Sequence, residues 1–141
     1  MVKQVSSGAI IFNENNERKY LLLLKGKYFE FVKGYIEEGE SEKETVKREV
    51  GEETGITEME FVNGFREIYT FAYKWNGKLI FREVILYLIK TKIEQVNISY
   101  EHDSFKWLTY QEALNIISFK NMKEILTKAN NYLDNSLNKY I

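Results

Sequence analysis

The segment at residues 34–56 constrains the fold of this chain most strongly, because it combines the signals of a helix with a concentration of charge. It holds eight carboxylates in twenty-three positions, although the 141-residue chain has a formal net charge of only −1. Ser41 and Glu44 have the spacing of a capping box, which predicts the start of a helix. Gly55 supplies a left-handed C′ residue, which ends the helix near Thr54. The segment is therefore predicted to form an acidic helix between two loops.

Three carboxylates of this helix are expected to lie on one face. Glu49, Glu52 and Glu53 stand at i, i+3 and i+4, and like charges at this spacing repel one another. Arg48 is the only cation in that turn. A hard divalent cation would relieve the repulsion, and in a chain without cysteine an all-oxygen site suits Mg²⁺ or Mn²⁺. The alternative is a solvated acidic face that binds no ion.

The composition excludes several classes of protein. A nearly balanced charge gives no overall basic field for nucleic acid or an anionic membrane surface, so the expected partner is a small molecule. The absence of cysteine excludes a disulfide framework, a thiolate nucleophile and a Cys-ligated metal centre. The longest apolar run, at residues 20–24, is too short to span a bilayer. We expect a single domain over residues 1–141, cytoplasmic and monomeric, with no membrane or protein partner.

The remaining apolar patterns predict the order of strands and helices. Strands are expected at residues 5–12, 19–25, 29–33, 59–73, 79–91 and 105–108, and further helices at 110–117 and from 118 onward. Asn76 and Gly77 favour a type I′ turn between the two long strands. After Leu133 an Asn-rich tail is expected to fray. This order predicts an α/β fold in which a mixed sheet has a helix on each side.

The spacing of the acidic segment resembles the Nudix box, G-x5-E-x7-R-E-U-x-E-E-x-G-U, in which U is a bulky aliphatic residue. Gly34, Glu40 and residues 48–56 match every position of this pattern. A chance match in a chain of this composition is on the order of one in a million. The resemblance implies the Nudix α/β/α sandwich, with a mixed sheet between helices, and hydrolysis of a nucleoside diphosphate linked to another group.

The resemblance also implies roles within the box. Glu49, Glu52 and Glu53 would hold Mg²⁺, with Mn²⁺ as the alternative. Arg48 and Glu40 would brace the loop against the helix, and the two glycines of the box would permit tight turns. The substrate phosphates are anions themselves, which explains why such chemistry needs a cation between two sets of acidic oxygens.

Six other segments resemble asymmetrically cleaving diadenosine tetraphosphate hydrolases, namely residues 7–12, 29–34, 64–67, 99–102, 105–108 and 118–123. This resemblance implies a Mg²⁺-dependent enzyme that splits diadenosine tetraphosphate into ATP and AMP by water attack on phosphorus. The loop before the box departs from the W-x-F-P-K-G-H pattern of those enzymes at Phe29, Val32 and Tyr35. Open alternatives are a nucleoside triphosphate pyrophosphatase acting on oxidised dGTP, an RNA 5′ pyrophosphohydrolase, and an inactive Nudix module that senses a nucleotide.

The same resemblance implies which residues bind the nucleotide. Lys33 and Arg82 would contact phosphate oxygens, although loop cations are often only solubilising. Phe71 and Phe119 would sandwich an adenine ring, since two aromatic faces suit a base whatever its hydrogen-bond pattern. The alternative for both aromatic residues is a place in the core.

Two residues of the 99–102 segment are further candidates. Glu101 would serve as a metal ligand or general base, and a box glutamate is the alternative base. His102, the only histidine of the chain, would bind a phosphate or cap the loop beside Trp107.

Overall fold

The computed structural model describes residues 2–138 of the chain. The strands and helices follow one another as β1 (Val2–Asn13), β2 (Lys19–Lys25), β3 (Tyr28–Glu30), β4 (Val32–Tyr35), α1 (Glu42–Thr54), β5 (Glu60–Trp75), β6 (Lys78–Lys90), β7 (Ser104–Leu108), α2 (Tyr110–Ile116) and α3 (Lys120–Asn138). Asn76 and Gly77 join β5 to β6 with φ values of 49° and 74°. Two consecutive positive φ angles are what a type I′ turn requires, so the predicted hairpin turn is confirmed.

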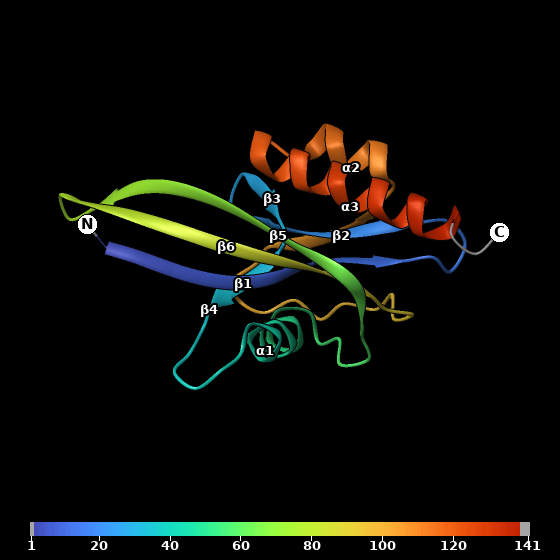
Figure 1. Cartoon of the computed structure of the whole chain (residues 1–141), viewed down its shortest axis with the longest axis horizontal. Coiled ribbons are helices and arrows are strands. Elements are labelled where there is room, and N and C mark those ends of the chain that lie inside the picture. Colours follow the sequence, from blue (N-terminus) through green and yellow to red (C-terminus); the bar gives the residue numbers. More distant parts are fainter. Residues whose placement is uncertain (1, 139–141) are drawn as a thin grey trace.

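The strands of residues 2–138 form one mixed sheet (Figure 1). Neighbouring strands follow the order β3-β2-β1-β6-β5, while β4 also pairs with β1 and β7 with β2. β1 runs parallel to β6, and the other pairings are antiparallel. β4 pairs with Ser6–Ala9 of β1, whereas β2 pairs with Phe12 and Asn13. Two different strands therefore share one edge of β1, and the predicted mixed sheet is confirmed.

The prediction of one strand at residues 29–33 is wrong. β3 pairs with β2, and β4 pairs with β1, so the chain changes its partner at Phe31. Phe31 is buried in the core beneath α3, and the next residue, Val32, is buried in the core beneath α1. The change of partner directs Lys33 and the box loop away from β2 and toward α1.

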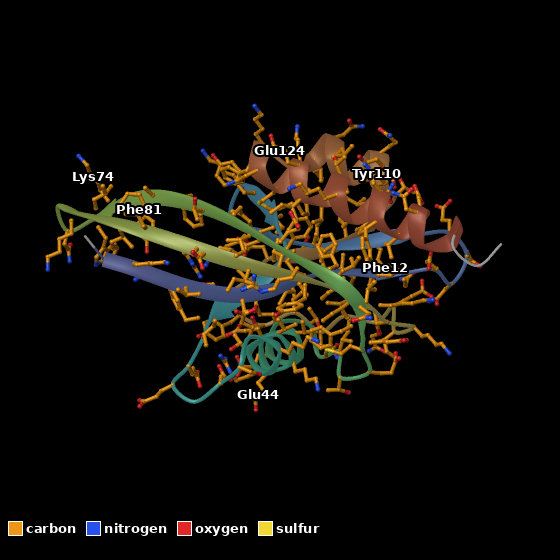
Figure 2. All side chains as sticks on the ribbon, viewed as in Figure 1. Phe12, Glu44, Lys74, Phe81, Tyr110 and Glu124 are labelled. Carbon is orange, nitrogen blue, oxygen red and sulfur yellow. The ribbon has the colours of Figure 1, made fainter. Side chains whose placement is uncertain are left out.

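Helices cover both faces of the sheet, as predicted: α1 lies on one face and α2 and α3 lie on the other (Figure 1). Side chains fill the spaces between the sheet and both helical layers (Figure 2). Val46 and Val50 of α1 are fully buried. They pack with residues of the sheet and the following loops, among them Ala9, Ile11, Leu21, Leu23, Val32, Ile56, Ile89 and Val96. The opposite core includes one face of α3, which consists of Met122, Ile125, Leu126 and Ala129.

α3 continues to Asn138, so residues 134–138 of the Asn-rich segment are helical, and its predicted fraying stays a prediction; residues 139–141 lie outside the described part. Leu133 is buried in the core. Arg18 donates to Asp134 at 2.7 Å and to Asn130 at 3.1 Å, which ties this end of the helix to the turn after β1. No helix within residues 2–138 has the length and apolar character needed to cross a membrane.

Candidate active site

The acidic helix begins and ends as the sequence predicts. Ser41 Oγ accepts from the Glu44 amide at 3.1 Å, and Glu44 accepts from the Ser41 amide at 2.8 Å. At the other end, Gly55 has φ of 77° and donates to the Gly51 carbonyl. These local bonds fix the direction of α1, so that its carboxylates face β4 and the loop before the helix.

Arg48 braces the loop against the helix. Its guanidinium donates to both oxygens of Glu40, at 2.7 and 3.0 Å, and to the Tyr35 carbonyl at 3.0 Å. It also donates to Glu49 at 2.8 Å. Glu40 in turn accepts from the Glu37 amide at 2.9 Å. The bond from Arg48 is the main reason that the pKa of Glu40 falls to about 2, so this carboxylate is charged throughout the neutral range.

Gly34 has a role that its sequence position did not reveal. It lies in β4 and does not have a positive φ, so the expectation that both box glycines form tight turns is right for Gly55 and wrong for Gly34. A Cβ atom at Gly34 would stand 2.0 Å from the carboxyl carbon of Glu49. The glycine therefore provides the space that the Glu49 carboxylate occupies.

The three box glutamates differ in exposure. Glu52 is exposed and Glu49 is partly buried, whereas Glu53 is only 3% exposed. Among the described residues, Glu53 Oε2 has no hydrogen-bond partner. Burial, followed by the neighbouring Glu49, Glu101 and Glu30, raises the pKa of Glu53 to about 9. In the absence of a cation, Glu53 therefore carries a proton at neutral pH.

A buried cluster joins Glu53 to the opposite side of the site. His102 Nδ1 lies 3.7 Å from Glu53 Oε1, and His102 Nε2 lies 3.1 Å from Glu30 Oε2. Lys33 Nζ lies 3.4 Å from the same Glu30 oxygen. Burial raises the pKa of Glu30, but the bond from His102 and the charge of Lys33 outweigh it, and the net pKa lies below its usual value.

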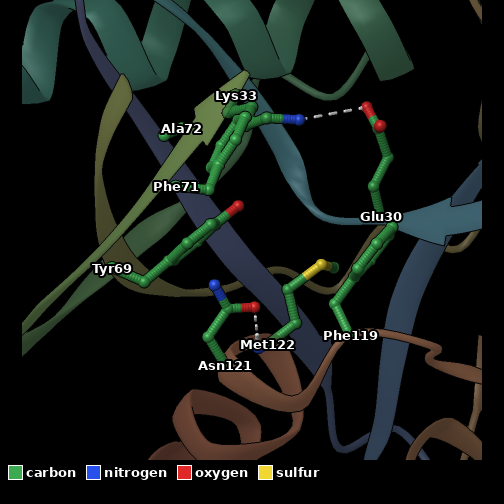
Figure 3. A pocket seen from close by; sticks show the side chains of 8 residues that line it. All are labelled: Glu30, Lys33, Tyr69, Phe71, Ala72, Phe119, Asn121 and Met122. Carbon is green, nitrogen blue, oxygen red and sulfur yellow. Dashed lines mark hydrogen bonds and ion pairs between the residues drawn. The ribbon is translucent and has the colours of Figure 1, made fainter. Parts of the chain in front are cut away.

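A cavity of about 370 Å³ opens beside this cluster (Figure 3). Phe71 and Phe119 lie on opposite sides of it, and Lys33 and Glu30 lie at the end nearest the box. The remaining lining residues are Tyr69, Ala72, Asn121 and Met122. Tyr69 stacks on Phe71 with ring centres 6.2 Å apart. The structure thus brings three of the predicted substrate-binding residues, Lys33, Phe71 and Phe119, to one cavity.

Arg82 does not line this cavity. Its Nε donates to Ser6 Oγ at 2.9 Å, and its guanidinium carbon lies 4.4 Å from the centre of the Tyr35 ring. Arg82 is therefore stacked beneath Tyr35, which follows Gly34 at the end of β4. Its predicted role in binding phosphate stays a prediction.

Glu101 lies in the exposed turn before β7. Its amide donates to Ser99 Oγ at 3.3 Å, and the His102 amide donates to the Ser99 carbonyl at 3.2 Å. Its charge contributes to the raised pKa of Glu53, so the turn faces the box glutamates. The His102 imidazole lies between Glu30 and Glu53. Its predicted role in binding a phosphate stays a prediction.

The sequence model of the NUDIX domain matches residues 2–129, which includes the box, the cavity and the Glu101 turn. This chain belongs to the Nudix family. Its α/β sandwich is the Nudix fold that the sequence predicted.

Named relatives of this Nudix chain include enzymes. It is similar to the mouse bis(5'-nucleosyl)-tetraphosphatase [asymmetrical], with 34% identity over 105 residues, 72% of this chain and 69% of the mouse protein. It is also similar to the Caenorhabditis elegans protein of that name, with 27% identity over 133 residues, which are 91% of this chain and 95% of the C. elegans protein. The solved binary complex of the C. elegans Ap4A hydrolase has a TM-score of 0.76 and 25% identity, and the match covers 94% and 98% of the two chains.

The residues of this Nudix site fit a divalent cation. Ligand atoms of Glu30, Glu53 and His102 lie within 4.8 Å of one another. Glu53 belongs to this group, and its other neighbours include the charge of Glu49; one of its oxygens, Oε2, has no hydrogen-bond partner among the described residues. A buried carboxylate among other carboxylates needs a proton or a cation, and hard oxygen ligands suit a divalent ion.

Sequence reasoning missed Glu30, Tyr69 and Asn121. Glu30 could have been noticed in the sequence, because it is a charged residue between two aromatic residues, Phe29 and Phe31, that are buried in the structure. A carboxylate in such a strand needs a partner, but that partner, His102, lies in a distant segment. Tyr69 shares a face of β5 with Phe71, as the two-residue period of a strand predicts. No pattern in the sequence points to Asn121.

Proposed function

We propose that this chain is a divalent-cation-dependent hydrolase that cleaves diadenosine tetraphosphate asymmetrically into ATP and AMP. The observation that carries the proposal is one continuous site: an aromatic-walled cavity ends at Lys33, and Glu30 and His102 connect that end to the box glutamates. The names of the mouse and C. elegans relatives support this substrate. The cavity accounts for binding of one nucleoside, and the acidic helix accounts for hydrolysis of the phosphate chain attached to it.

Glu49, Glu52 and Glu53 would hold the cation, Mg²⁺ or Mn²⁺. When bound, such an ion neutralises charge on the phosphoryl group and lowers the pKa of the attacking water. Arg48 contributes indirectly, because its bonds to Glu40 and Glu49 fix the direction of the Glu49 carboxylate. A preorganised carboxylate needs no rearrangement during the reaction.

Phe71 and Phe119 would stack on an adenine ring, and Lys33 would pair with a phosphate oxygen near the box. Lys33 is paired with Glu30 at 3.4 Å in the structure, so phosphate would compete for a cation that is already held near the correct place. Base stacking gives affinity without reading the edge of the base. The second nucleoside would lie outside this cavity, which is consistent with unequal products.

Two carboxylates are candidates for accepting the proton of the attacking water. Glu101 is exposed in the turn that faces the box, whereas Glu53 is buried and its pKa is raised to about 9 without a cation. A general base must be ionised before the reaction. We propose Glu101 for this role, with Glu53 as a ligand, and expect Glu101→Gln to lower kcat while cation affinity stays near normal.

The test is product analysis with diadenosine tetraphosphate and Mg²⁺ in H₂¹⁸O. Equal amounts of ATP and AMP are expected, with the heavy oxygen in AMP, because water attacks the phosphorus farther from the triphosphate side. Glu53→Gln should lower turnover by orders of magnitude while the circular dichroism spectrum stays unchanged. Two ADP products, or turnover of oxidised dGTP or 5′-triphosphate RNA without turnover of the dinucleotide, would refute the proposed substrate.

A further inference from the structure

The single histidine of this chain is placed unusually for an imidazole. The His102 side chain is only 1% exposed, and each ring nitrogen faces a carboxylate: Nε2 lies 3.1 Å from Glu30, and Nδ1 lies 3.7 Å from Glu53. Among the described residues, Nδ1 has no hydrogen-bond partner. The same is true of Glu53 Oε2. Two unpartnered buried polar atoms therefore belong to adjacent side chains.

Glu30 decides which ring nitrogen carries the proton of a neutral imidazole. Its carboxylate lies 3.4 Å from Lys33 Nζ, so it is a charged acceptor, and it accepts the proton on Nε2. In the neutral ring, Nδ1 is then an acceptor with a free lone pair. Once Glu53 is ionised, its carboxylate and that lone pair repel each other unless a positive charge lies between them.

We propose that His102 Nδ1 and Glu53 are ligands of one divalent cation, and that Glu30 positions the imidazole. The inference rests on the cation site of the proposed function, but it adds a nitrogen ligand to a site that the sequence predicts to be all oxygen. A carboxylate that accepts from the far nitrogen of a metal-ligating histidine is a recurrent arrangement, because it fixes both the tautomer and the ring orientation.

A nitrogen ligand changes which ions the site prefers. Mg²⁺ favours oxygen ligands and retains its waters, and Mn²⁺ likewise suits oxygen ligands, whereas imidazole raises affinity for borderline ions such as Co²⁺ and Zn²⁺. We therefore expect the wild-type protein to bind Co²⁺ more tightly than Mg²⁺ and Mn²⁺. The size of that difference should depend on His102.

The first experiment is calorimetric titration of the metal-free full chain with Mg²⁺, Mn²⁺ and Co²⁺. His102→Gln should weaken Co²⁺ binding by roughly tenfold or more and Mg²⁺ and Mn²⁺ binding much less, since outer partners alone are worth about 10–100-fold in affinity. Glu124→Gln, a substitution of an exposed residue on α3 across the sheet from the box, is the control and should leave all three affinities unchanged. An unaltered preference in His102→Gln would overturn the inference.

The second experiment uses the wild-type chain and does not depend on a variant that folds. One histidine gives one imidazole in a long-range ¹H–¹⁵N spectrum, so its two nitrogens are assigned without ambiguity. We expect Nε2 protonated and Nδ1 unprotonated in the metal-free protein, and a shift of Nδ1 alone on saturation with Zn²⁺. Protonation of both nitrogens, or an Nδ1 signal unmoved by bound Zn²⁺, would show instead an imidazolium bridging Glu30 and Glu53.

The positioning role of Glu30 is tested by paired substitutions. Glu30→Gln keeps an oxygen that can accept from Nε2 and should retain most Co²⁺ affinity and the visible absorption spectrum of the Co²⁺ form. Glu30→Leu removes the acceptor and should alter both. Equal effects of the two substitutions would contradict the positioning role. A wild-type chain that takes up none of these ions would refute the cation site of the proposed function itself, which is a different outcome from an unchanged metal preference.

Discussion

The carboxyl group of Glu49 occupies the space over Gly34, where any Cβ atom would come within 2.0 Å of it. β4 and α1 therefore approach each other closely at this point, and they can do so because Gly34 has no side chain. Arg48 holds the other side of the same carboxylate at 2.8 Å. The position of Glu49 is thus fixed by contacts rather than by its place on the helix alone.

Gly34→Ala should damage activity far more than stability. The clash is with the flexible end of Glu49, so the free energy of unfolding should fall by less than about 1 kcal/mol. Displacing the carboxylate should lower kcat by roughly 100-fold, the scale of an ångström-sized misplacement. Urea unfolding and steady-state kinetics measure the two effects.

Gly51→Ala is the matched control for that substitution. A Cβ atom at Gly51 meets nothing within 4 Å. Alanine should stabilise α1 by about 0.5–1 kcal/mol and leave turnover unchanged. Wild-type kinetics in Gly34→Ala would show that the contact with Glu49 has no catalytic importance.

The metal-free protein should become less stable as the pH rises. Glu53 has a pKa of about 9 when folded, against 4.5 in the reference state. Between these values the folded chain holds a proton that the unfolded chain has lost, so the free energy of unfolding decreases by up to about 1.4 kcal/mol per pH unit. Urea unfolding in EDTA from pH 5 to 8.5 measures the slope.

Glu53→Gln has no proton to lose and should flatten that slope, and saturating Mn²⁺ should flatten it in the wild type. The difference between wild type and variant isolates Glu53 from the other titrating groups. An identical slope in both proteins would mean that Glu53 is not the group responsible.

Arg48→Lys should loosen the loop before α1. A lysine cannot contact both Glu40 oxygens, the Tyr35 carbonyl and Glu49 together, because it lacks the planar fork of arginine. Amide hydrogen exchange should become faster at residues 36–41, above all at Glu37, whose amide donates to Glu40. Turnover should fall roughly 10- to 100-fold. Unchanged exchange with reduced turnover would indicate a direct role for Arg48 instead.

Phe119→Ala should raise KM for diadenosine tetraphosphate with little effect on kcat. Loss of one stacking face is worth about 1–3 kcal/mol, or roughly a 5- to 150-fold increase in KM. Trp75→Ala is the control, because Trp75 is 64% exposed beside the β5–β6 turn and does not line the cavity. Equal kinetic effects of the two substitutions would exclude Phe119 from base binding.

Local signals explain what could be predicted from the sequence. The capping box at Ser41, the C′ glycine at Gly55 and the Asn76–Gly77 turn depend on residues within a few positions of one another, and all three are confirmed. The spacing of the box predicted the family because its fixed positions lie within one helix and the loops on either side of it, all close together in the sequence.

Long-range contacts explain what could not be predicted. Glu30 and His102 are 72 positions apart, and only the sheet brings β3 and the turn before β7 together. The separation of β3 from β4 at Phe31 arises because β3 pairs with β2 and β4 pairs with β1. Nothing in the residues around Phe31 predicts these two pairings. Arg82 lies beneath Tyr35 because of the β1–β6 and β1–β4 registers, which periodicity does not determine.

The parallel pairing of β1 with β6 has a consequence for the order of folding. β4, which carries Lys33 and Gly34, is held by β1, and the other edge of β1 is completed only by a strand from the second half of the chain. Closing such a long loop is entropically slow, and parallel pairing of distant strands raises contact order. During synthesis, the nascent chain would therefore hold a fully translated but catalytically incompetent box until β6 leaves the ribosome.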